Sequence, residues 1–153
     1  MAGRPLGPAQ AHSGFGQDGG NRSPQLAWNG FPPETASFAV TCFDPDAVTG
    51  SGFWHWILVD IPADVHTLHE GAGSPERCPP GASHVRNDFG ELAYGGAATR
   101  PGQAEHRYVF AVHALSQPTL GVDTDTSPAM VGARLGAFSI ARARLVATSP
   151  DHR

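Results

Sequence analysis

The alternation of apolar and polar positions along the chain predicts several β-strands. In "SFAVTCF", residues 37–43, both alternate faces are mostly apolar, which is typical of a strand inside a sheet. The segments "WHWILVDIP" (54–62) and "HRYVFAVHAL" (106–115) are rich in β-branched and aromatic residues, and Pro62 ends the first of them. A last strand is predicted at about residues 140–147.

One helix is predicted near the end of the chain. Ser127 is placed to cap the first turn, and Pro128 suits the first helical position. Val131 and Leu135 then follow at helical spacing in "AMVGARLGAF". Several strands against one late helix, with 19 glycines and 14 prolines in 153 residues, predict a mainly β domain.

The composition predicts one domain with loose ends. Residues 1–20 are rich in Gly, Ala, Pro and Gln, so they bury too little apolar surface to offset their ordering entropy, and a disordered arm is expected. The folded domain is predicted over residues 21–148, with a tail at 149–153. Residues 62–93 are expected to run over the surface with at most short strands.

Charge and cysteine content exclude several functional classes. The formal net charge is −4, and the 10 basic residues form no stripe of the kind that neutralises nucleic acid. No apolar run is long enough to span a bilayer or resembles a secretory signal. Two cysteines give no disulfide framework, so a cytoplasmic location is predicted.

A concentration of polar and aromatic groups in "TCFDPDAVTGSGFWHW" is the first candidate site. Asp44 and Asp46 flank a proline and would ordinarily form a turn. A hairpin of this length can also bring a carboxylate near His55, which fixes the imidazole tautomer and turns the other N–H toward a ligand. Strand alternation places Trp54 and Trp56 on the face opposite His55.

The second candidate site lies in "YGGAATRPGQAEHRYVF", residues 94–110. Gly96 and its neighbouring glycines allow the backbone to approach a ligand, and their successive amides can form an anion-holding nest. His106 and Tyr108 are two residues apart on a strand and therefore share a face. Such a pair alone is usually a surface feature, but two separate glycine-rich and proline-rich turns leading to such groups favour a site.

These motifs carry a family resemblance. "NRSPQLAW", "FDPDAVTGSGFWHW", "YGGAA" with "HRYVFAVHAL", and "SPAMVG" resemble, in order, the phosphatidylethanolamine-binding protein family and its bacterial Raf-kinase-inhibitor-like branch. The resemblance implies a β-sandwich with a large antiparallel sheet, a smaller sheet and a C-terminal helix. It also implies an anion pocket formed by Asp44, His55, Gly96, His106 and Tyr108, with Asp46 alongside.

The chain departs from the family pattern at several positions. Val48 replaces the last proline of the family's DPDAP motif, and Thr99 and Arg100 replace a Pro-Pro pair at the pocket mouth. Phe138 stands where bacterial members commonly have a histidine. No strand-like pattern precedes Asn21, so either the start is misassigned or one sheet edge is bare, and a bare edge would permit a homodimer.

The favoured function is binding of a small phosphate- or carboxylate-bearing molecule without catalysis, metal or cofactor. His55 and His106 would supply N–H donors, Tyr108 an O–H donor, and the Gly96 loop its amides. Binding should weaken as pH rises and the imidazoles lose their charge. A regulatory role through a kinase-like protein partner is a further hypothesis, because animal members of the family resemble kinase inhibitors.

The alternative from another class is a metal-dependent, cupin-like enzyme. Its ligands would be His55, His106 and His113, with Glu91 or Glu105 as the carboxylate. The sequence has no HxH pair, and His113 should point to the opposite face of its strand from His106. No motif places a nucleophile for serine or thiol hydrolysis.

Overall fold

The fold is a five-stranded antiparallel sheet with a small sheet on one face and a helix on the other. The computed structural model describes residues 4–14, 19–99 and 102–149. The large sheet has the order β5-β3-β2-β6-β7 and the small one pairs β1 with β4. The elements are η1 (Pro8–Gln10), β1 (Leu26–Ala27), β2 (Ser37–Asp44), β3 (Phe53–Pro62), β4 (Thr67–Leu68), β5 (Ser83–His84), β6 (Arg107–Leu115), α1 (Pro128–Phe138) and β7 (Ser139–Thr148).

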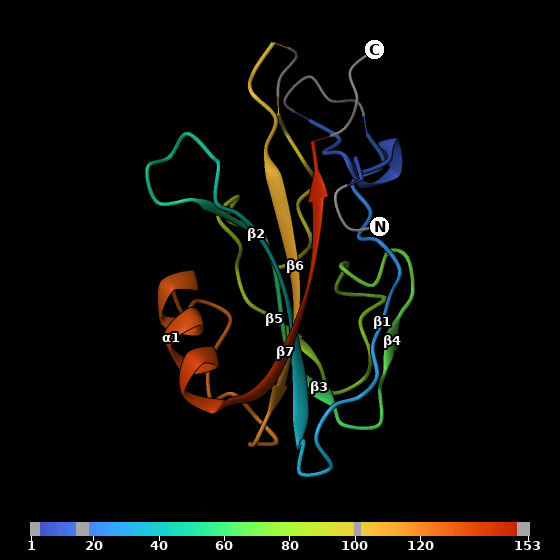
Figure 1. The fold of residues 1–153 in the computed structure, drawn as a ribbon, viewed down its shortest axis with the longest axis vertical. Helices are drawn as coiled ribbons and strands as arrows, with labels where there is room; N and C mark the ends of the chain where they lie inside the picture. Colours follow the sequence, from blue (N-terminus) through green and yellow to red (C-terminus); the bar gives the residue numbers. More distant parts are fainter. Residues whose placement is uncertain (1–3, 15–18, 100–101, 150–153) are drawn as a thin grey trace.

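These layers confirm the predicted fold class. Figure 1 shows α1 on one side of the large sheet and β1 with β4 on the other. The predicted strands correspond to β2, β3, β6 and β7, and the predicted helix corresponds to α1. The surface excursion after β3 contains only the two-residue strands β4 and β5, as expected.

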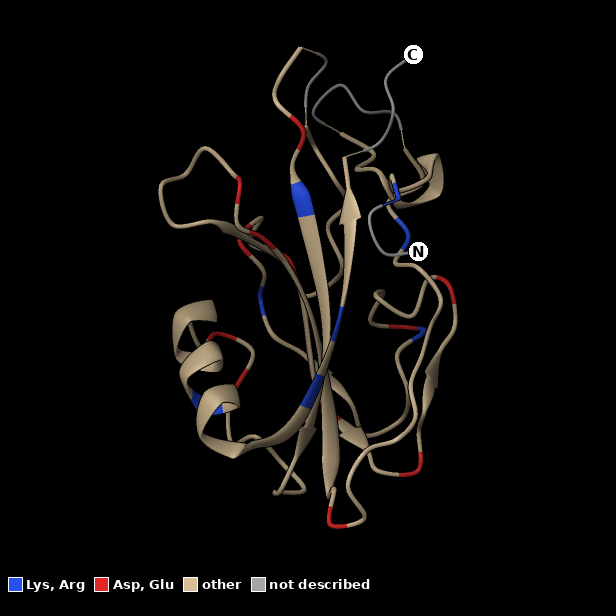
Figure 2. Ribbon diagram, viewed as in Figure 1, with Lys and Arg blue, Asp and Glu red and all other residues tan. Residues whose placement is uncertain are grey.

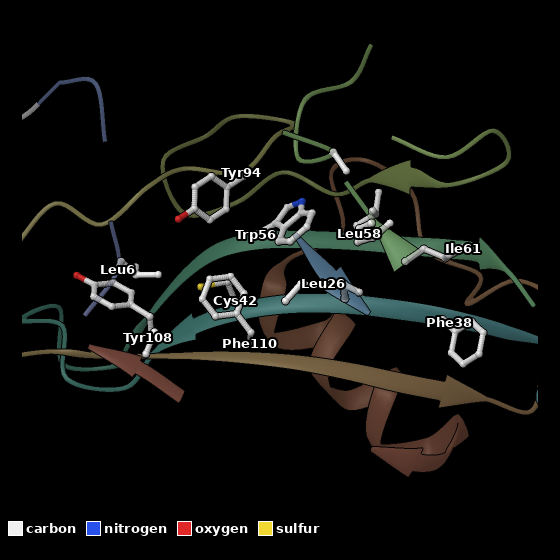
Figure 3. Close-up of a cluster of buried hydrophobic side chains, with 14 of the residues drawn as sticks. Leu6, Leu26, Phe38, Cys42, Trp56, Leu58, Ile61, Tyr94, Tyr108 and Phe110 are labelled. Atoms are coloured by element: carbon white, nitrogen blue, oxygen red, sulfur yellow. The ribbon is translucent and has the colours of Figure 1, made fainter. Parts of the chain in front are cut away.

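The central strand β2 separates two hydrophobic cores. Phe38, Val40 and Cys42 belong to the larger cluster beneath the small sheet, whereas Ala39 belongs to the cluster beneath α1. Figure 3 shows the larger cluster, with Tyr108 at the end opposite Phe38. Because both faces of β2 are buried, its side chains stabilise the two cores at once.

The helix forms where the sequence predicts it. The Ser127 side chain accepts a hydrogen bond from the Met130 amide at 3.3 Å, and Pro128 occupies the first turn. Val131 and Leu135 are the buried residues of α1 and pack in the smaller cluster. The helix covers only part of its sheet face, which leaves a groove described below.

A β-bulge corrects the predicted orientation of the two tryptophans. Cys42 pairs with Trp56 and Phe43 pairs with Trp54, so His55 is an extra residue in β3. The strict alternation assumed for this strand therefore fails. Trp54 packs on the helix side with a ring-centroid distance of 4.6 Å to Phe43, whereas Trp56 is fully buried in the larger cluster.

The N-terminal segment is packed where the structure describes it, which differs from the loose arm expected for residues 1–20. Leu6 is 3% exposed, and its amide donates to the Thr148 carbonyl at 3.0 Å. The Thr148 amide donates in turn to the Arg4 carbonyl, so this segment covers the end of β7. These hydrogen bonds and the buried Leu6 offset the ordering entropy that composition alone leaves unbalanced.

Candidate functional site

One concave pocket gathers most of the predicted site residues. It has a volume of about 420 Å³ and lies where β2 ends and where β3 and β6 begin. In Figure 1 this is the end of the large sheet from which the loop after β2 projects. The pocket is lined by Asp44, Ala47, Val48, Thr49, Phe53, His55, Phe89, Ala98, Thr99, Gln103, His106 and Tyr108.

An ion pair between His106 and Asp44 is the best-defined polar feature of the pocket. The His106 Nδ1 lies 2.8 Å from the Asp44 Oδ2, and both side chains are largely buried. The other Asp44 oxygen accepts the Asp46 amide at 2.8 Å, which holds the carboxylate in place. Because an ionised carboxylate only accepts, His106 donates through Nδ1 and its Nε2 is available to a ligand.

This pairing corrects the predicted partner of Asp44. From the sequence, that carboxylate is expected beside His55, across the hairpin between β2 and β3. In the structure Asp44 is opposite Phe53, and His55 lies two residues further along β3. The imidazole beside Asp44 comes instead from His106, which immediately precedes β6 on the other side of β2.

His55 is a buried and neutral wall of the pocket. Its side chain is 4% exposed, and burial lowers its pKa despite opposing effects from the Gly95 carbonyl and the Asp44 charge. The His55 Nδ1 lies 2.8 Å from the Gly95 carbonyl oxygen and donates to it. In the neutral ring Nε2 is then an acceptor, which differs from the N–H donor role expected from sequence.

Tyr108 belongs to a chain of hydroxyl groups. Its hydroxyl lies 2.6 Å from the Thr99 Oγ1, to which the Ser149 Oγ donates at 3.1 Å. Ser149 also accepts a hydrogen bond from the His106 backbone amide at 2.8 Å. It therefore connects His106 directly, and Tyr108 through Thr99, to the end of β7. Burial raises the pKa of Tyr108 to about 12, and the phenol therefore stays protonated at neutral pH.

Two predicted site residues do not line the pocket. Asp46 faces outward and accepts from the Arg107 backbone amide and guanidinium at 2.8 to 2.9 Å, bonds that lower its pKa to about 2. The Gly96 amide donates to the Asn21 Oδ1 at 2.8 Å. A side chain at Gly96 would collide with the Gln10 carbonyl, so this glycine permits the N-terminal segment to approach.

Most of the remaining wall of the pocket is apolar. Phe53 and Phe89 meet at a ring-centroid distance of 4.7 Å, and Phe53 also contacts the His55 ring at 5.0 Å. Val48, 85% exposed, stands at the mouth. The sequence analysis did not identify Phe89, which comes from the long excursion after β3. The Arg100 predicted at the mouth lies outside the described residues.

The structure gives no support to the metal-enzyme alternative. Among the residues it describes, no group of three or more His, Cys, Asp or Glu side chains could hold a metal ion. His113 lines a groove on the helix side of the sheet, whereas His106 lines the pocket. Within the same described parts of the chain, no helix is long and apolar enough to cross a membrane.

Comparison with known proteins agrees with the fold and with the motifs. The family model for phosphatidylethanolamine-binding protein matches residues 3–149. The chain belongs to the phosphatidylethanolamine-binding protein family. The Escherichia coli protein YbhB is 48% identical over 136 residues, which are 88% of this chain and 85% of YbhB. The E. coli protein YbcL is 48% identical over 145 residues, which are 94% of this chain and 79% of YbcL.

Solved structures of the phosphatidylethanolamine-binding protein family superpose closely. The crystal structure of E. coli YbcL, described as a new member of the mammalian family, matches with a TM-score of 0.94 and covers 98% of this chain and 93% of YbcL. A homologue from Chlamydia trachomatis matches with a TM-score of 0.79 at 26% identity, covering 99% of this chain and 92% of its own. These relatives are bacterial proteins, which confirms the predicted resemblance to the bacterial branch of the family.

Proposed function

We propose that the pocket at the end of β2 and β6 binds a small molecule bearing a phosphate or carboxylate group, without transforming it. The observation that carries this proposal is the buried His106–Asp44 pair, 2.8 Å apart, in a pocket with aromatic walls. When the His106 ring carries both protons, Nδ1–H donates to Asp44 and Nε2–H can donate to an anion. The apolar walls strengthen that hydrogen bond by excluding water.

Tyr108 supplies a second donor. Ser149 donates a hydrogen bond to the Thr99 hydroxyl, which can in turn donate one to the Tyr108 oxygen. The phenolic hydrogen is then directed to the ligand rather than to the protein. Thr99, one of the two departures from the family's Pro-Pro pair, thereby helps to orient a binding group.

His55 selects among anions. With Nδ1 donating to Gly95, its Nε2 accepts a hydrogen bond. A ligand that carries both an anionic oxygen and a donor matches His106 and His55 together. A monoanionic phosphate has such a protonated oxygen, and phosphorylethanolamine adds an ammonium group.

A binding role rather than an enzymatic one is supported by the state of the nearby thiol. Burial raises the pKa of Cys42 well above its usual value, and the negative charge of Asp44 raises it further. That thiol is therefore a poor nucleophile.

Cys42 and Cys78 are both free, which supports a reducing, cytoplasmic environment.

A protein partner is a second candidate role at the same mouth. Val48 is 85% exposed on the loop that closes one side of the pocket, so a partner that covers the mouth of the pocket would contact it. A kinase-like regulator is the partner that the family resemblance suggests. Pull-down with and without phosphate, using wild-type protein and Val48→Asp, tests whether any partner requires this surface.

The direct test is calorimetric titration with inorganic phosphate and with phosphorylethanolamine between about pH 5.5 and 8, the range in which histidines change charge. We expect saturable binding that weakens as pH rises. His106→Ala should weaken it at least about tenfold, because it removes a charge-assisted hydrogen bond. His69→Ala, at an exposed histidine outside the pocket, is the matched control and should bind normally. Absence of binding in the wild type, or equal binding in His106→Ala, would refute the proposal.

A further inference from the structure

A second hollow lies on the opposite face of the large sheet. It is a groove of about 510 Å³ between α1 and the strands β2, β6 and β7, within the roughly 300–1,000 Å³ range of small-molecule sites. Its lining shares no residue with the histidine pocket. The groove is lined by Thr41, Phe43, Trp54, Val109, Ala111, His113, Gly132, Leu135, Gly136, Ser139, Ile140, Ala141, Arg142 and Arg144.

The groove stays open because α1 carries glycines where it borders the groove. A methyl group added at Gly132 would lie 3.8 Å from the Trp54 ring, and one added at Gly136 would meet no atom within 4 Å. Below the helix, Phe43 and Trp54 pack together at 4.6 Å and form an apolar floor with Val109. A ligand with an apolar portion can therefore lie between α1 and these aromatic rings.

The other side of the groove is cationic. Arg142 and Arg144 are two residues apart on the edge strand β7 and share a face, opposite His113 and Ala111 of β6. Figure 2 shows them as the blue bands on β7. Neither forms an ion pair with a described residue, and the lining contains no aspartate or glutamate. Two uncompensated positive charges thus border an apolar floor.

A buried histidine on the floor is affected by this charge. His113 is 8% exposed, and its ring makes only long contacts of 3.4 Å to the Thr41 and Ser139 hydroxyl oxygens. Burial, together with the positive charge of Arg142, lowers the pKa of His113 to about 4. The positive potential of β7 therefore extends into the groove, where an anion would be stabilised.

We propose that this groove binds an anionic amphiphile, an alkyl carboxylate whose chain lies against Trp54 and whose head group meets Arg142 and Arg144. The complementarity of charge and of apolar surface supports this class of ligand. Exposed arginines alone bind a bare anion weakly, because water and salt screen the charge. The apolar floor alone would not distinguish a charged chain from a neutral one. Together they favour a molecule with both features.

The test is titration of the protein with decanoate below its micelle concentration, followed by the indole N–H signals in NMR. The Trp54 signal, assigned with Trp54→Phe, should shift saturably. Decanol tests the chain without charge, acetate tests the charge without chain, and both should bind at least about tenfold more weakly. His106→Ala should bind decanoate normally, which separates this site from the phosphate pocket.

Two variants locate the ligand. Gly136→Leu fills open space in the groove and suits a helix better than glycine, so it should block binding without unfolding the protein. Ala133→Leu, on the exposed side of the same helix, is the matched control. Arg142→Gln with Arg144→Gln should weaken decanoate about tenfold, whereas Arg4→Gln with Arg77→Gln removes two charges elsewhere and should not.

Three outcomes would overturn the proposal. One is a decanoate affinity that is unchanged in Gly136→Leu and in the Arg142 and Arg144 double variant. Another is equal binding of decanol and decanoate, which would show a non-specific apolar surface. The third is a concentration-dependent dimer that Gly136→Leu abolishes while decanoate fails to bind, which would assign the groove to a second copy of the chain.

Discussion

The pocket and the groove differ in how the protein holds their polar groups. In the pocket, Asp44 binds His106 at 2.8 Å and is itself held by a backbone amide at 2.8 Å. In the groove, Arg142 and Arg144 extend from an edge strand without an acidic partner in the described chain. Fixed donors suit a compact anion whose geometry must match, whereas exposed cations suit a ligand bound mainly through its apolar part.

The two sites are built on opposite faces of the same strands. On β6, Tyr108 faces the pocket, whereas Val109, Ala111 and His113 face the groove. On β2, Asp44 lines the pocket and its neighbour Phe43 lines the groove. Side-chain alternation therefore lets one strand supply two sites, and a substitution on one face need not disturb the other.

The largest expected effect is a loss of folding stability at low pH. It comes from the buried histidines His84 and His113 and not from His106, which is paired with Asp44. Burial lowers the pKa of His84 and of His113 from 6.5 to about 4. The unfolded chain therefore binds protons more readily between those values, so stability is full above about pH 6.5 and is lost as pH falls toward 4. We expect a loss of about 2 kcal/mol per histidine between pH 7 and pH 5.

Urea unfolding at both pH values checks this expectation. His113→Gln and His84→Gln should each reduce the loss by about 2 kcal/mol. An exposed control, His69→Ala, should retain the wild-type pH dependence. Equal pH dependence in all four proteins would contradict the assignment of these buried rings as neutral.

The next largest effect is expected at the pocket. Asp44→Asn preserves size but cannot accept hydrogen bonds at both of its terminal atoms, so either His106 or the Asp46 amide loses its partner. The free energy of unfolding should fall by about 2 kcal/mol, and phosphate affinity should fall about tenfold or more. Decanoate binding in the groove should be unchanged, and a parallel loss there would show that the sites are not independent.

A smaller and opposite effect is expected in the groove. Gly136→Leu should raise the free energy of unfolding by about 0.5–1 kcal/mol, because glycine is a poor helix former and the added side chain meets open space. Chemical denaturation beside Ala133→Leu measures this gain. Phosphate titration of the same variant should match the wild type. A loss of stability would mean that the groove is too tightly packed to admit a ligand.

The smallest effect is expected at Asp46, which lies beside the pocket and is not part of its lining. Arg107→Gln should leave phosphate affinity within about twofold of the wild type, because an exposed ion pair contributes little. The pKa of Asp46 should rise from about 2 toward its ordinary value of 3.8. Carboxyl NMR titration detects the rise, and a large loss of phosphate binding would return Asp46 to the site.

Much of the fold was predictable because it rests on local signals. The alternating apolar pattern of β2, β3 and β6 gave the sheet, and Ser127 with Pro128 gave the start of α1. The DPDA, WHW and HRY motifs contain Asp44, His55, His106 and Tyr108, which all line the pocket.

The remaining features depend on contacts between distant residues. The bulge at His55 shows only in the pairing of two strands, so the sequence could not indicate that Trp54 and Trp56 separate. Ser149 contacts Thr99 across 50 residues, which no local pattern predicts. Similarly, the packing of Leu6 depends on hydrogen bonds to the last strand.

Nitrogen-15 NMR of the imidazole rings during a phosphate titration distinguishes the roles of the two pocket histidines. We expect His106 to donate through Nδ1 to Asp44 and its Nε2 signal to move as phosphate binds. His55 should remain a neutral ring protonated on Nδ1 throughout. A phosphate-dependent protonation of His55 with no response at His106 would contradict the assigned roles of the two histidines.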